Sequence, residues 1–505
     1  MTDEKVRAAL RSEARLVVVE APAGCGKTYL GAEYARHVAS ENKRPLILTH
    51  THAACSVFAE RTSGLAKTVE IRTIDSLIAS IARAYHLGLG LPADIEAWIR
   101  DDRDGRGHSH VASKVGSLLM RHPMIAASLA RRHSVVICDE HQDSSGDQHS
   151  VTTALLKNGA SVRVFGDPMQ AIFKQVRVPG GHEPWNWDTL GAQAHAFEQL
   201  ATPHRWRNGS TELGDWTLLA RNALKRGGQL DLRSRPPSVQ LVFAENTSPV
   251  HGGYQLSAQD RQALDAFERK ARSLLLLTRR TATVLSLRSF FNRRLPLWEG
   301  HTRDALDTLA AALRVAQGNP EALADCVVKF MGAVGKGFTE SAFGKPLKVE
   351  IRAGCARSRK GKPAHIQDLA RFLISQPDHR GVANALARIN QLKEEIPGFS
   401  CIHIDCFREF WEATRVGQFE AMDVALREIA RRRTFARPLP PARAISTIHK
   451  AKGLECDDVA ILPCDAETFP DNHLSRCLLY VAISRARKRL LIVASRQRPS
   501  PLLAL

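Results

Sequence analysis

The segment Leu16–Thr28 reads LVVVEAPAGCGKT and decides the fold of the first part of the chain. Leu16–Glu20 is a short apolar run rich in valine, which is typical of a buried strand. It passes directly into a glycine-containing turn and then into the amphipathic stretch YLGAEYARHVAS. This order of strand, turn and helix predicts a loop whose backbone N–H groups, with the helix N-terminus behind them, cradle phosphate groups.

The turn matches the phosphate-loop pattern GxxxxGK[ST], except that Ala21 stands in place of the first glycine. We expect Lys27 to reach the β- and γ-phosphates of a nucleotide and Thr28 to bind Mg²⁺. A tight turn with a chance lysine is the alternative, but the flanking strand and helix favour the phosphate loop. The predicted nucleotide-binding residues of this loop are Ala21, Pro22, Ala23, Gly24, Cys25, Gly26, Lys27 and Thr28.

Apolar runs alternate with helical patterns along much of the chain. Strands are predicted at Pro45–Thr49, Ser134–Cys138 and Val162–Phe165, and later at Leu274–Thr278, Ala444–Thr447, Val459–Leu462 and Arg489–Val493. Such alternation predicts an α/β fold with parallel sheets covered by helices. Leu- and Ala-rich helical patterns dominate between Arg293 and Pro441, and a shorter helical stretch lies at about 79–131. Both read as helical insertions.

A pair of acidic residues follows the predicted strand Ser134–Cys138, in the sequence DEHQD. Asp139, at the strand end, is placed to hold the Mg²⁺ shell. Glu140 is placed to polarise an attacking water as general base. Adjacent acids are more often an exposed turn, but the buried strand and the upstream phosphate loop favour a catalytic pair.

The composition favours a polyanionic partner. Among 505 residues, Lys and Arg number 71 and Asp and Glu 52, which gives a formal net charge of +19. Such charge suits nucleic acid or an acidic membrane surface. The ten cysteines form no CxxC pair, so we expect buried thiols in a reducing compartment rather than a zinc site. No apolar run reaches the roughly 18 residues of a membrane span, and we expect a cytoplasmic protein with no membrane partner.

At this point the motifs resemble those of the UvrD/Rep-like superfamily 1A DNA helicases. DEHQD is similar to motif II, DExQD, and the other motifs follow in the family's order. They are LTHTHAAC at Leu48–Cys55 for motif Ia, TIDSL at Thr73–Leu77 for Ib, GDPMQAIF at Gly166–Phe173 for III, LATPHRWR at Leu200–Arg207 for IV, TIHKAKGLE at Thr447–Glu455 for V and LLYVAISRAR at Leu478–Arg487 for VI.

The resemblance implies two RecA-like P-loop domains with parallel sheets, each carrying a helical insertion. It places the first domain (1A) at 1–78 and 132–200, with a 1B-like insertion at 79–131. It places the second domain (2A) at 201–295 and 441–505, with a 2B-like insertion at 296–440. The chain is also similar in size and motif set to compact members such as the helicase-like subunit of Gabija antiphage systems.

The resemblance also implies roles for residues outside the phosphate loop. With ATP and Mg²⁺ bound, Gln170 would sense the γ-phosphate, and Arg205 and Arg485 would act as arginine fingers. Gly453 and Glu455 of motif V would face the nucleotide. The residues implied to face the DNA strand are His50, His52, Phe173, Thr447 and His449.

Several positions depart from the family pattern. No glutamine precedes Gln142, so the usual reader of adenine is missing. Gln175 and Val176 stand where a Trp-Arg pair is usual, and the Trp normally stacks on a base; Phe173, Trp185 or Trp187 are the candidates to replace it. Asp75 stands where a histidine is common, near the expected DNA phosphate. These changes weaken the expected grip on single-stranded DNA and leave the ATPase residues intact.

The leading hypothesis is therefore an ATP-dependent helicase or translocase that moves 3′ to 5′ on single-stranded or 3′-tailed DNA. An alternative is a regulatory ATPase subunit that senses nucleotide or DNA and gates a partner nuclease in antiphage defence. A third is a basic nucleic-acid binder without hydrolysis, against which the intact catalytic residues argue. The sequence leaves open the oligomeric state and the pathway, DNA repair or antiviral defence.

Overall fold

The computed structural model describes residues 2–101, 106–173, 178–246, 254–298, 304–435 and 441–505. The chain forms two compact units. The first unit, Met1–Phe290 with Thr447–Leu505, holds all the motifs quoted above. The second unit, Phe291–Ser446, is mostly helical. The sequence therefore leaves the first unit once and returns to it just before motif V.

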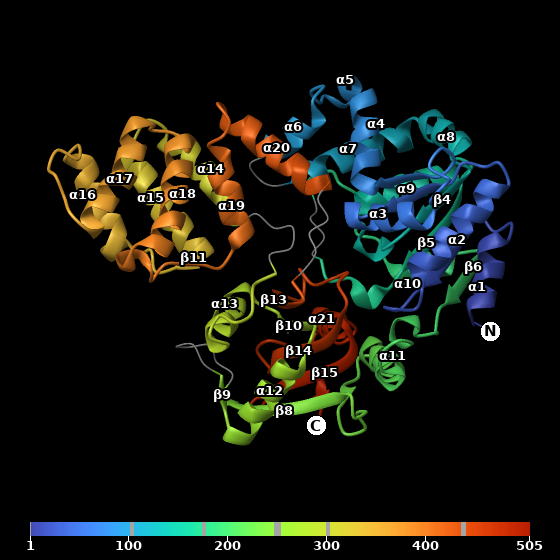
Figure 1. Cartoon of the computed structure of the whole chain (residues 1–505). Helices are drawn as coiled ribbons and strands as arrows, with labels where there is room; N and C mark the ends of the chain where they lie inside the picture. The colour runs from blue at the N-terminus through green and yellow to red at the C-terminus, as the bar shows by residue number, and fades with distance from the viewer. Residues whose placement is uncertain (1, 102–105, 174–177, 247–253, 299–303, 436–440) are drawn as a thin grey trace. The chain divides into compact units, whose positions relative to one another are not determined.

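The first unit contains a six-stranded parallel sheet in the order β3-β2-β4-β5-β1-β6 (Figure 1). Its strands are β1 (Leu16–Glu20), β2 (Leu46–Thr49), β3 (Glu70–Thr73), β4 (Val135–Cys138), β5 (Ser161–Gly166) and β6 (Ala196–Gln199). Because all strands run the same way, their carboxyl ends lie at one edge of the sheet. The phosphate loop and DEHQD both follow strands at that edge, where ligands bind in open α/β sheets.

Helices cover both faces of this sheet. Leu16 and Val18 of β1 belong to one apolar core and Val17 and Val19 to another, as expected for a strand buried on two sides. The helices of this region are α1 (Thr2–Arg11), α2 (Lys27–Ser40), α3 (His52–Arg61), α4 (Ile74–Ala84), α5 (His86–Leu89), α6 (Ile95–Asp101), α7 (Gly107–Arg121), α8 (Pro123–Arg132), α9 (Gly146–Lys157) and α10 (Trp187–Gln193), with the 3₁₀ turns η1 (His141–Asp143) and η2 (Pro168–Gln170).

A second sheet in the same unit contains the neighbours β10-β14-β15-β8-β9. The strands are β8 (Val239–Asn246), β9 (Gln255–Leu256), β10 (Leu274–Thr278), β14 (Cys456–Cys464) and β15 (Ala486–Ser495), of which β9 alone is antiparallel to its neighbour. Around it lie η3 (His204–Trp206), α11 (Thr211–Lys225), α12 (Ala258–Lys270), α13 (Thr281–Phe290), α21 (His473–Ile483) and the short pair β7 (Leu230–Asp231) and β16 (Leu503–Ala504).

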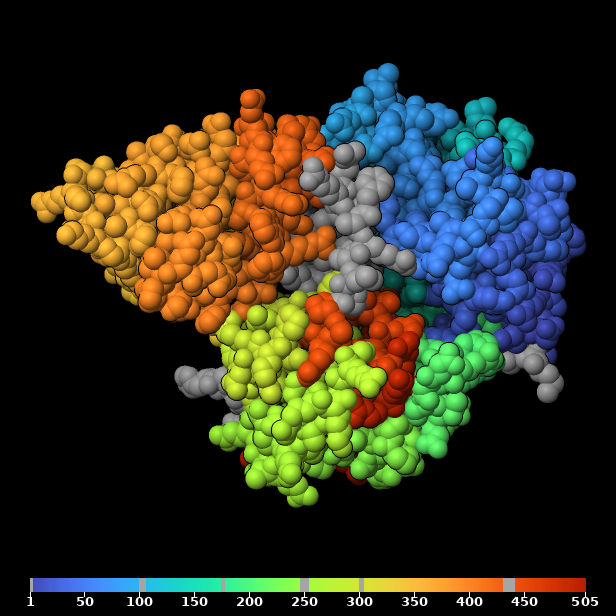
Figure 2. All heavy atoms as spheres, in the orientation of Figure 1, coloured from blue at the N-terminus to red at the C-terminus, as the bar shows by residue number. Residues whose placement is uncertain are grey.

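Segments far apart in the sequence build this second sheet. β8 pairs with β15 over Val239–Ala244 and Leu490–Ser495, so the C-terminal segment packs beside residues that precede it by about 250 positions. In Figure 2 the green residues of α11 and the red residues of the C-terminal segment lie side by side on the visible surface. Both sheets belong to one compact unit, so the division into two RecA-like domains at the boundaries given above stays a prediction.

The second unit is built from seven α-helices of the described chain around one apolar core. They are α14 (Asp304–Ala316), α15 (Pro320–Val334), α16 (Lys345–Arg352), α17 (Lys362–Ser375), α18 (His379–Glu395), α19 (Phe407–Val416) and α20 (Met422–Phe435). Shorter elements are β11 (Gly335–Lys336), a π-helical turn (η5, Glu340–Gly344), a 3₁₀ turn (η6, Pro397–Phe399), β12 (His403–Ile404) and β13 (Arg443–Thr447), at which the chain returns to the first unit.

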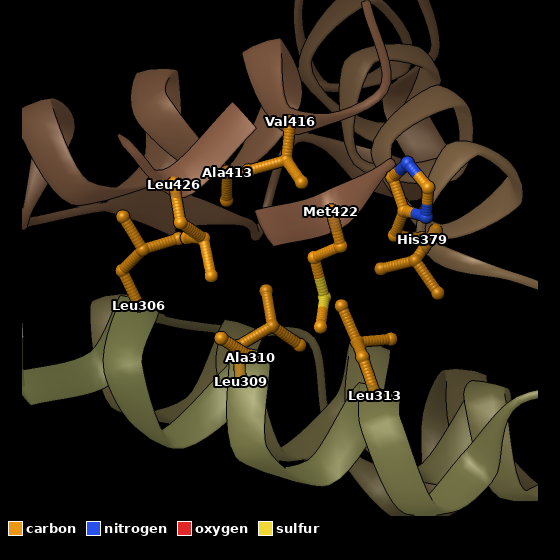
Figure 3. Close-up of a pocket in the computed structure, with 10 residues that line it drawn as sticks. Leu306, Leu309, Ala310, Leu313, His379, Ala413, Val416, Met422 and Leu426 are labelled. Carbon is orange, nitrogen blue, oxygen red and sulfur yellow. The ribbon is translucent and has the colours of Figure 1, made fainter. Parts of the chain in front are cut away.

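A small cavity lies inside this helical core (Figure 3). Side chains of α14 point into it towards side chains of α19 and α20. His379 is the one polar residue of its lining, and its Nε2 atom lies 2.9 Å from the carbonyl oxygen of Phe419. The lining residues are Leu306, Leu309, Ala310, Leu313, His379, Val382, Ala413, Val416, Met422 and Leu426. The cavity is therefore a gap in apolar packing.

The predicted α/β class is confirmed, and the predicted strands lie within two residues of the observed ones or inside them. β3, β6 and β8 are additional strands that the sequence did not predict. Within the described part of the chain, no helix combines the length and the apolar character needed to cross a membrane.

Candidate active site

The phosphate loop joins β1 to α2, and its two glycines have positive φ angles, 75° at Gly24 and 83° at Gly26. Residues with a side chain rarely adopt this left-handed conformation. Space is also lacking at Gly24, because a Cβ atom there would lie 2.7 Å from the Cβ of Arg205 and 2.8 Å from the ring of Trp206. Glycine is therefore needed for the chain to turn into α2 at Lys27.

Two other loop positions are explained by their surroundings. Ala21, which replaces the first glycine of the pattern, is buried, and its N–H donates to the carbonyl of Gly166 at 2.8 Å. It thus extends the β1–β5 ladder in a conformation that alanine accepts. Cys25 is also buried; burial, with a smaller effect of the nearby Asp167 charge, raises the pKa of its thiol to about 12. This thiol is a packing group rather than a nucleophile.

Lys27 lies between the loop and the acidic pair at the end of β4. Its Nζ atom is 3.4 Å from Oδ1 of Asp139 and forms an ion pair with Oε1 of Glu140. Asp139 is fixed by its own N–H, which donates to the carbonyl of Leu48 on β2 at 2.8 Å. The structure thus brings together the three residues that the sequence predicts for phosphate binding, metal binding and base catalysis.

The electrostatics of this cluster follow from burial and proximity. Burial alone would lower the pKa of Lys27, but the carboxylates of Asp139 and Glu140 overcome this effect and raise it. Burial raises the pKa of Asp139 to about 6. Burial acts in the same direction on Glu140, yet Lys27 and Lys452 hold the pKa of its carboxyl well below the ordinary value. Glu140 is therefore ionised at neutral pH, as a general base must be.

Glu140 has a strained backbone, with φ at 54°. A non-glycine residue in this region costs on the order of 1 kcal/mol or more, and such strain is concentrated at functional sites. Gln142 holds the side chain from the other side, because its Nε2 donates to Oε2 of Glu140 at 2.5 Å. The Oε1 atom of Gln142 accepts the N–H of Asp167 at 3.1 Å. Gln142 therefore joins Glu140 to motif III.

The donor set fits a nucleotide with Mg²⁺. Apart from its ion pair with Lys27, the buried Oδ1 of Asp139 has no hydrogen-bond partner among the described residues, so this carboxylate oxygen could bind a cation at the carboxyl edge of the sheet. Thr28 lies half-buried in the first turn of α2, directly after Lys27. Hydroxyl and carboxylate oxygens are the ligands Mg²⁺ prefers, together with phosphate oxygens.

Gln170 lies buried in η2, and its Nε2 donates to Oδ2 of Asp167 at 3.0 Å. A residue of motif V reaches this region. The Nζ atom of Lys452 donates to both carboxylate oxygens of Asp143, at 2.8 and 2.5 Å, and to the carbonyl of Gln170 at 2.6 Å. Lys452 thereby ties motif V to the ends of motifs II and III.

Two arginines lie beside the phosphate loop. The N–H of Arg205 donates to the carbonyl of Gly24 at 3.0 Å, and its guanidinium pairs with Glu455 at 3.0 Å and donates to the carbonyl of Ser484 at 2.6 Å. Arg485 is buried and donates to the carbonyls of Val481 and Leu454 and to the hydroxyl of Ser484. Burial, and then the charge of Arg205, lower the pKa of Arg485 to about 10.

No ion pair joins Arg485 to a carboxylate among the described residues, whereas Glu455 neutralises Arg205. A buried cation without a counter-ion is costly unless an anion arrives. Gly453 has φ at 85° and is exposed, with open space around its Cα. Of the predicted nucleotide-facing residues of motifs IV, V and VI, Arg205 thus contacts both the loop and Glu455, and Arg485 donates to the carbonyl of Leu454 in motif V.

The side chains predicted to face a DNA strand lie in separate places. Phe173 is half exposed, and its ring centre is 6.2 Å from that of His449 and 5.0 Å from Nζ of Lys452. Thr447 is buried, and its hydroxyl accepts the N–H of Lys450. His52 is exposed at the start of α3. Of these residues, the structure brings Phe173 and His449 together.

His50 belongs to a chain of hydrogen bonds that leads into α9. Its Nε2 lies 3.1 Å from the hydroxyl of Ser144, which lies 3.2 Å from Nδ1 of His141. The other ring nitrogen of His141 lies 3.0 Å from Nδ1 of His149, whose ring stacks on Trp185 at 4.9 Å. Burial lowers the pKa of His50 to about 4, so it is uncharged at neutral pH.

Three sequence-based expectations about the strand side are changed by these contacts. Trp187 is buried and donates to Glu20 at 3.1 Å, so it offers no open face to a base. Trp185 is occupied by the stack with His149. Asp75 accepts a hydrogen bond from Gln148 at 2.7 Å and thereby joins α4 to α9. Residues 175–177, where the family has its Trp-Arg pair, lie outside the described residues.

Sequence reasoning missed the residues that connect the motifs. Lys452 and Asp143 both stand inside quoted motifs, and their opposite charges are the signal that could have paired them. Arg221, on α11, bonds to Glu20 and Asp167 in the interior. Nothing in its local sequence, LLARNALK, distinguishes it from a surface arginine.

Comparison with known families agrees with this geometry. A family model described as an AAA domain matches residues 3–176, which contain the phosphate loop, DEHQD and motif III. A model described as the UvrD-like helicase C-terminal domain matches residues 443–493, which contain motifs V and VI. A search of curated proteins finds no match. An AAA domain match over the N-terminal part and a UvrD-like helicase match near the C-terminal end together support a UvrD/Rep-like helicase-type ATPase.

Proposed function

We propose that the protein hydrolyses ATP to move 3′ to 5′ along single-stranded DNA, with unwinding of 3′-tailed duplex as a consequence. The observation that carries this proposal is the contact of Lys27 with Asp139 and Glu140, beside two arginines from the second-sheet region. The direction of movement rests on the resemblance of the motifs alone. In this proposal the protein acts in the cytoplasm, in DNA repair or antiphage defence.

The first step is binding of the triphosphate by the loop. Lys27 exchanges its ion pairs with Asp139 and Glu140 for the β- and γ-phosphates, and this exchange releases both carboxylates for their own roles. Thr28 and Asp139 would hold Mg²⁺, which would neutralise part of the phosphate charge. Gln170, held by Asp167, would contact the γ-phosphate.

The second step is hydrolysis. Glu140, ionised and held by Gln142, accepts a proton as water attacks the γ-phosphorus and the bond to the ADP oxygen breaks. Arg205 and Arg485 stabilise the charge on the transferring phosphoryl group. Both arginines belong to the segments around the second sheet, so hydrolysis depends on how closely that sheet approaches the loop.

The link to DNA runs through motif V. The exposed ring of Phe173, beside the half-buried ring of His449, is the face on which a base would stack, and Lys452 contacts both Phe173 and Asp143. A change in the position of motif V would thus displace Asp143, the last residue of DEHQD. This coupling supports a DNA-stimulated ATPase.

A second candidate is a regulatory ATPase that gates a partner nuclease with little unwinding. The observation that favours it is that His50 and Asp75, at positions that face DNA in the family, are already bonded to Ser144 and Gln148. Fewer groups are then free to grip the strand.

The test is hydrolysis of each of the four NTPs by the full-length protein, with and without single-stranded DNA. We expect DNA-stimulated hydrolysis, and we expect Glu140→Gln to lower kcat by about 10²- to 10⁴-fold, the range of general-base catalysis. Glu60→Gln, at an exposed site on α3, is the matched control.

Two outcomes separate the candidates. Displacement of the complementary strand from 3′-tailed but not 5′-tailed duplex supports the motor and its direction. A rate of hydrolysis that single-stranded DNA does not change contradicts the motor and favours the regulatory subunit. Equal rates with all four NTPs would show that, without the upstream glutamine, the protein does not select ATP over the other nucleotides.

A further inference from the structure

Arg221, in the middle of α11, carries a fully buried charge. None of its side chain is exposed. A buried guanidinium is costly unless paired and hydrogen-bonded, and an apolar residue of similar size is often as stable in such a place. The partners of Arg221 therefore indicate what the charge is for.

Those partners are two carboxylates at the ends of neighbouring strands. The Nη2 atom of Arg221 lies 2.7 Å from Oε1 of Glu20 and 2.6 Å from Oδ1 of Asp167, and its Nε lies 3.1 Å from Oδ1 of Asp167. Lys225, one helical turn later, donates to Oε1 of Glu20 at 2.6 Å. Two cations of α11 thus balance one carboxylate directly before the phosphate loop and one directly after β5.

Asp167 passes this contact on to the proposed catalytic groups. Its Oδ2 accepts the amide N–H of Gln170 at 3.0 Å, and its backbone N–H donates to Gln142 at 3.1 Å. Gln142 in turn donates to Glu140 at 2.5 Å. Arg221 is therefore two contacts away from Gln170 and three contacts away from Glu140.

The residues around Gly166 and Asp167 are tightly packed. A Cβ atom on Gly166 would lie 2.6 Å from the ring of Trp187 and 2.8 Å from Oε1 of Gln142. A shift of Asp167 is thus resisted by packing on its N-terminal side and by Arg221 on the other.

A second contact joins the same region to the loop. The guanidinium of Arg221 lies 6.0 Å from the ring centre of Tyr480, and the Tyr480 hydroxyl accepts the N–H of Ala23 at 2.8 Å. Tyr480 is fully buried on α21, which packs against α11. A shift of α11 or α21 would therefore act on the loop through Tyr480 and on Asp167 through Arg221.

We propose that Arg221 is a positioning residue that sets Gln170 and Glu140 through Asp167, so that the placement of α11 controls the rate of hydrolysis. This inference rests on the proposed function, because it assigns Arg221 a part in that same reaction. Arg221 itself contacts neither the loop nor the groups that would bind phosphate.

The test is steady-state hydrolysis by full-length Arg221→Lys. Lysine keeps the charge but lacks the planar fork that reaches both carboxylates. We expect kcat to fall by about 10- to 100-fold, as for a small displacement of a catalytic group, with little change in KM. Arg226→Lys, exposed one residue beyond α11, should behave as the wild type.

A double-mutant cycle separates positioning from support of the fold. If Arg221 acts through Gln170, then Arg221→Lys slows a Gln170→Ala protein much less than it slows the wild type. Equal losses in both backgrounds, or an unchanged kcat, would overturn the proposal. An unaltered melting temperature for Arg221→Lys is expected to accompany the loss of kcat.

If Arg221→Lys does not fold, the double variant Glu20→Gln/Arg221→Gln, which removes one charge of each sign, is measured instead. The same fall in kcat is expected for it. Failure of both proteins to fold makes the cluster a folding element and overturns the proposal. Failure of the proposed function is a different result, since the wild type itself would then hydrolyse no NTP, and both inferences would fall.

Discussion

The proposed phosphate site and the side chains proposed to face a DNA strand, called the strand side below, hold their chemistry in different ways. At the phosphate site the side chain of Lys27 is 11% exposed and lies against two carboxylates. On the other side Phe173 is 52% exposed, and its neighbour His449 is an imidazole whose pKa is lowered by burial. Charge that is buried must be paired, whereas an open aromatic face needs no partner until a base arrives.

The difference teaches which part of the site is fixed before ligands bind. Lys27, Asp139 and Glu140 constrain one another, and any change at one is felt by the others. The strand side depends on single rings, with His50 uncharged and bonded inward. Lys452 contacts residues of both regions, so a substitution at Lys452 tests whether the two regions are coupled.

Among the variants that test the link between these two regions, the largest effect is expected from Lys452→Met. The variant removes the cation that pairs with Asp143 and lies 5.0 Å from the ring centre of Phe173. We expect stimulation of hydrolysis by single-stranded DNA to fall about 5- to 150-fold, the range of a typical coupling between sites, while unstimulated hydrolysis changes less. The ratio of rates with and without DNA measures it.

The control for this variant is Lys488→Met. Lys488 also pairs with an aspartate, Asp457 at 2.9 Å, but on an exposed surface, so its loss should leave the ratio unchanged. If Lys452→Met lowers both rates in the same proportion, then Lys452 supports the fold and does not connect the two regions.

The same contrast governs what the sequence could predict. The central strands were found because β1, β2, β4 and β10 are buried along their whole length and therefore read as apolar runs. β3 and β6 were missed because they are the two edges of the first sheet. EIRT and AFEQ are only partly buried and carry polar residues, so no apolar run marks them.

The site residues that the sequence predicts together are those that lie close to one another along the chain. The phosphate loop and DEHQD each place their groups within a few residues, so backbone geometry alone brings the side chains to one edge. The pairing of Lys452 with Asp143 spans 309 residues and that of Arg221 with Asp167 spans 54. Such contacts depend on how segments distant in the sequence pack against one another, which no local pattern encodes. The burial of Trp187 is of the same kind.

A smaller effect is expected from Phe173→Ala. The variant removes the exposed ring of the strand side and leaves the phosphate site untouched. We expect the affinity for single-stranded DNA to weaken about fivefold, near the lower end of the roughly 1–3 kcal/mol of a stacked base, because the ring already packs on His449. Fluorescence anisotropy with labelled oligothymidine measures the Kd.

Phe197→Ala is the control for Phe173→Ala. Phe197 is 44% exposed on the edge strand β6. An unchanged Kd in Phe173→Ala would show that the strand lies elsewhere, and the two regions would then be less closely joined than the contacts of Lys452 suggest.

The smallest effect on activity is expected from the histidine chain beneath His50, which acts on stability. Burial lowers the pKa of both His50 and His149 to about 4, below the 6.5 or so of an unfolded chain. The unfolded state then binds more protons between pH 6.5 and 4, so the stability these groups contribute is present above pH 6.5 and is lost as the pH falls. We expect His149→Gln to remove about 2 kcal/mol of this acid sensitivity between pH 7 and pH 5. Urea midpoints at pH 7 and pH 5 measure it, with the exposed His108→Gln as control. An equal fall of the midpoint in wild type and His149→Gln would show that His149 does not carry the acid response. The raised pKa of Asp139 could not explain such a fall, because a carboxyl with a raised pKa stabilises the folded state as the pH falls.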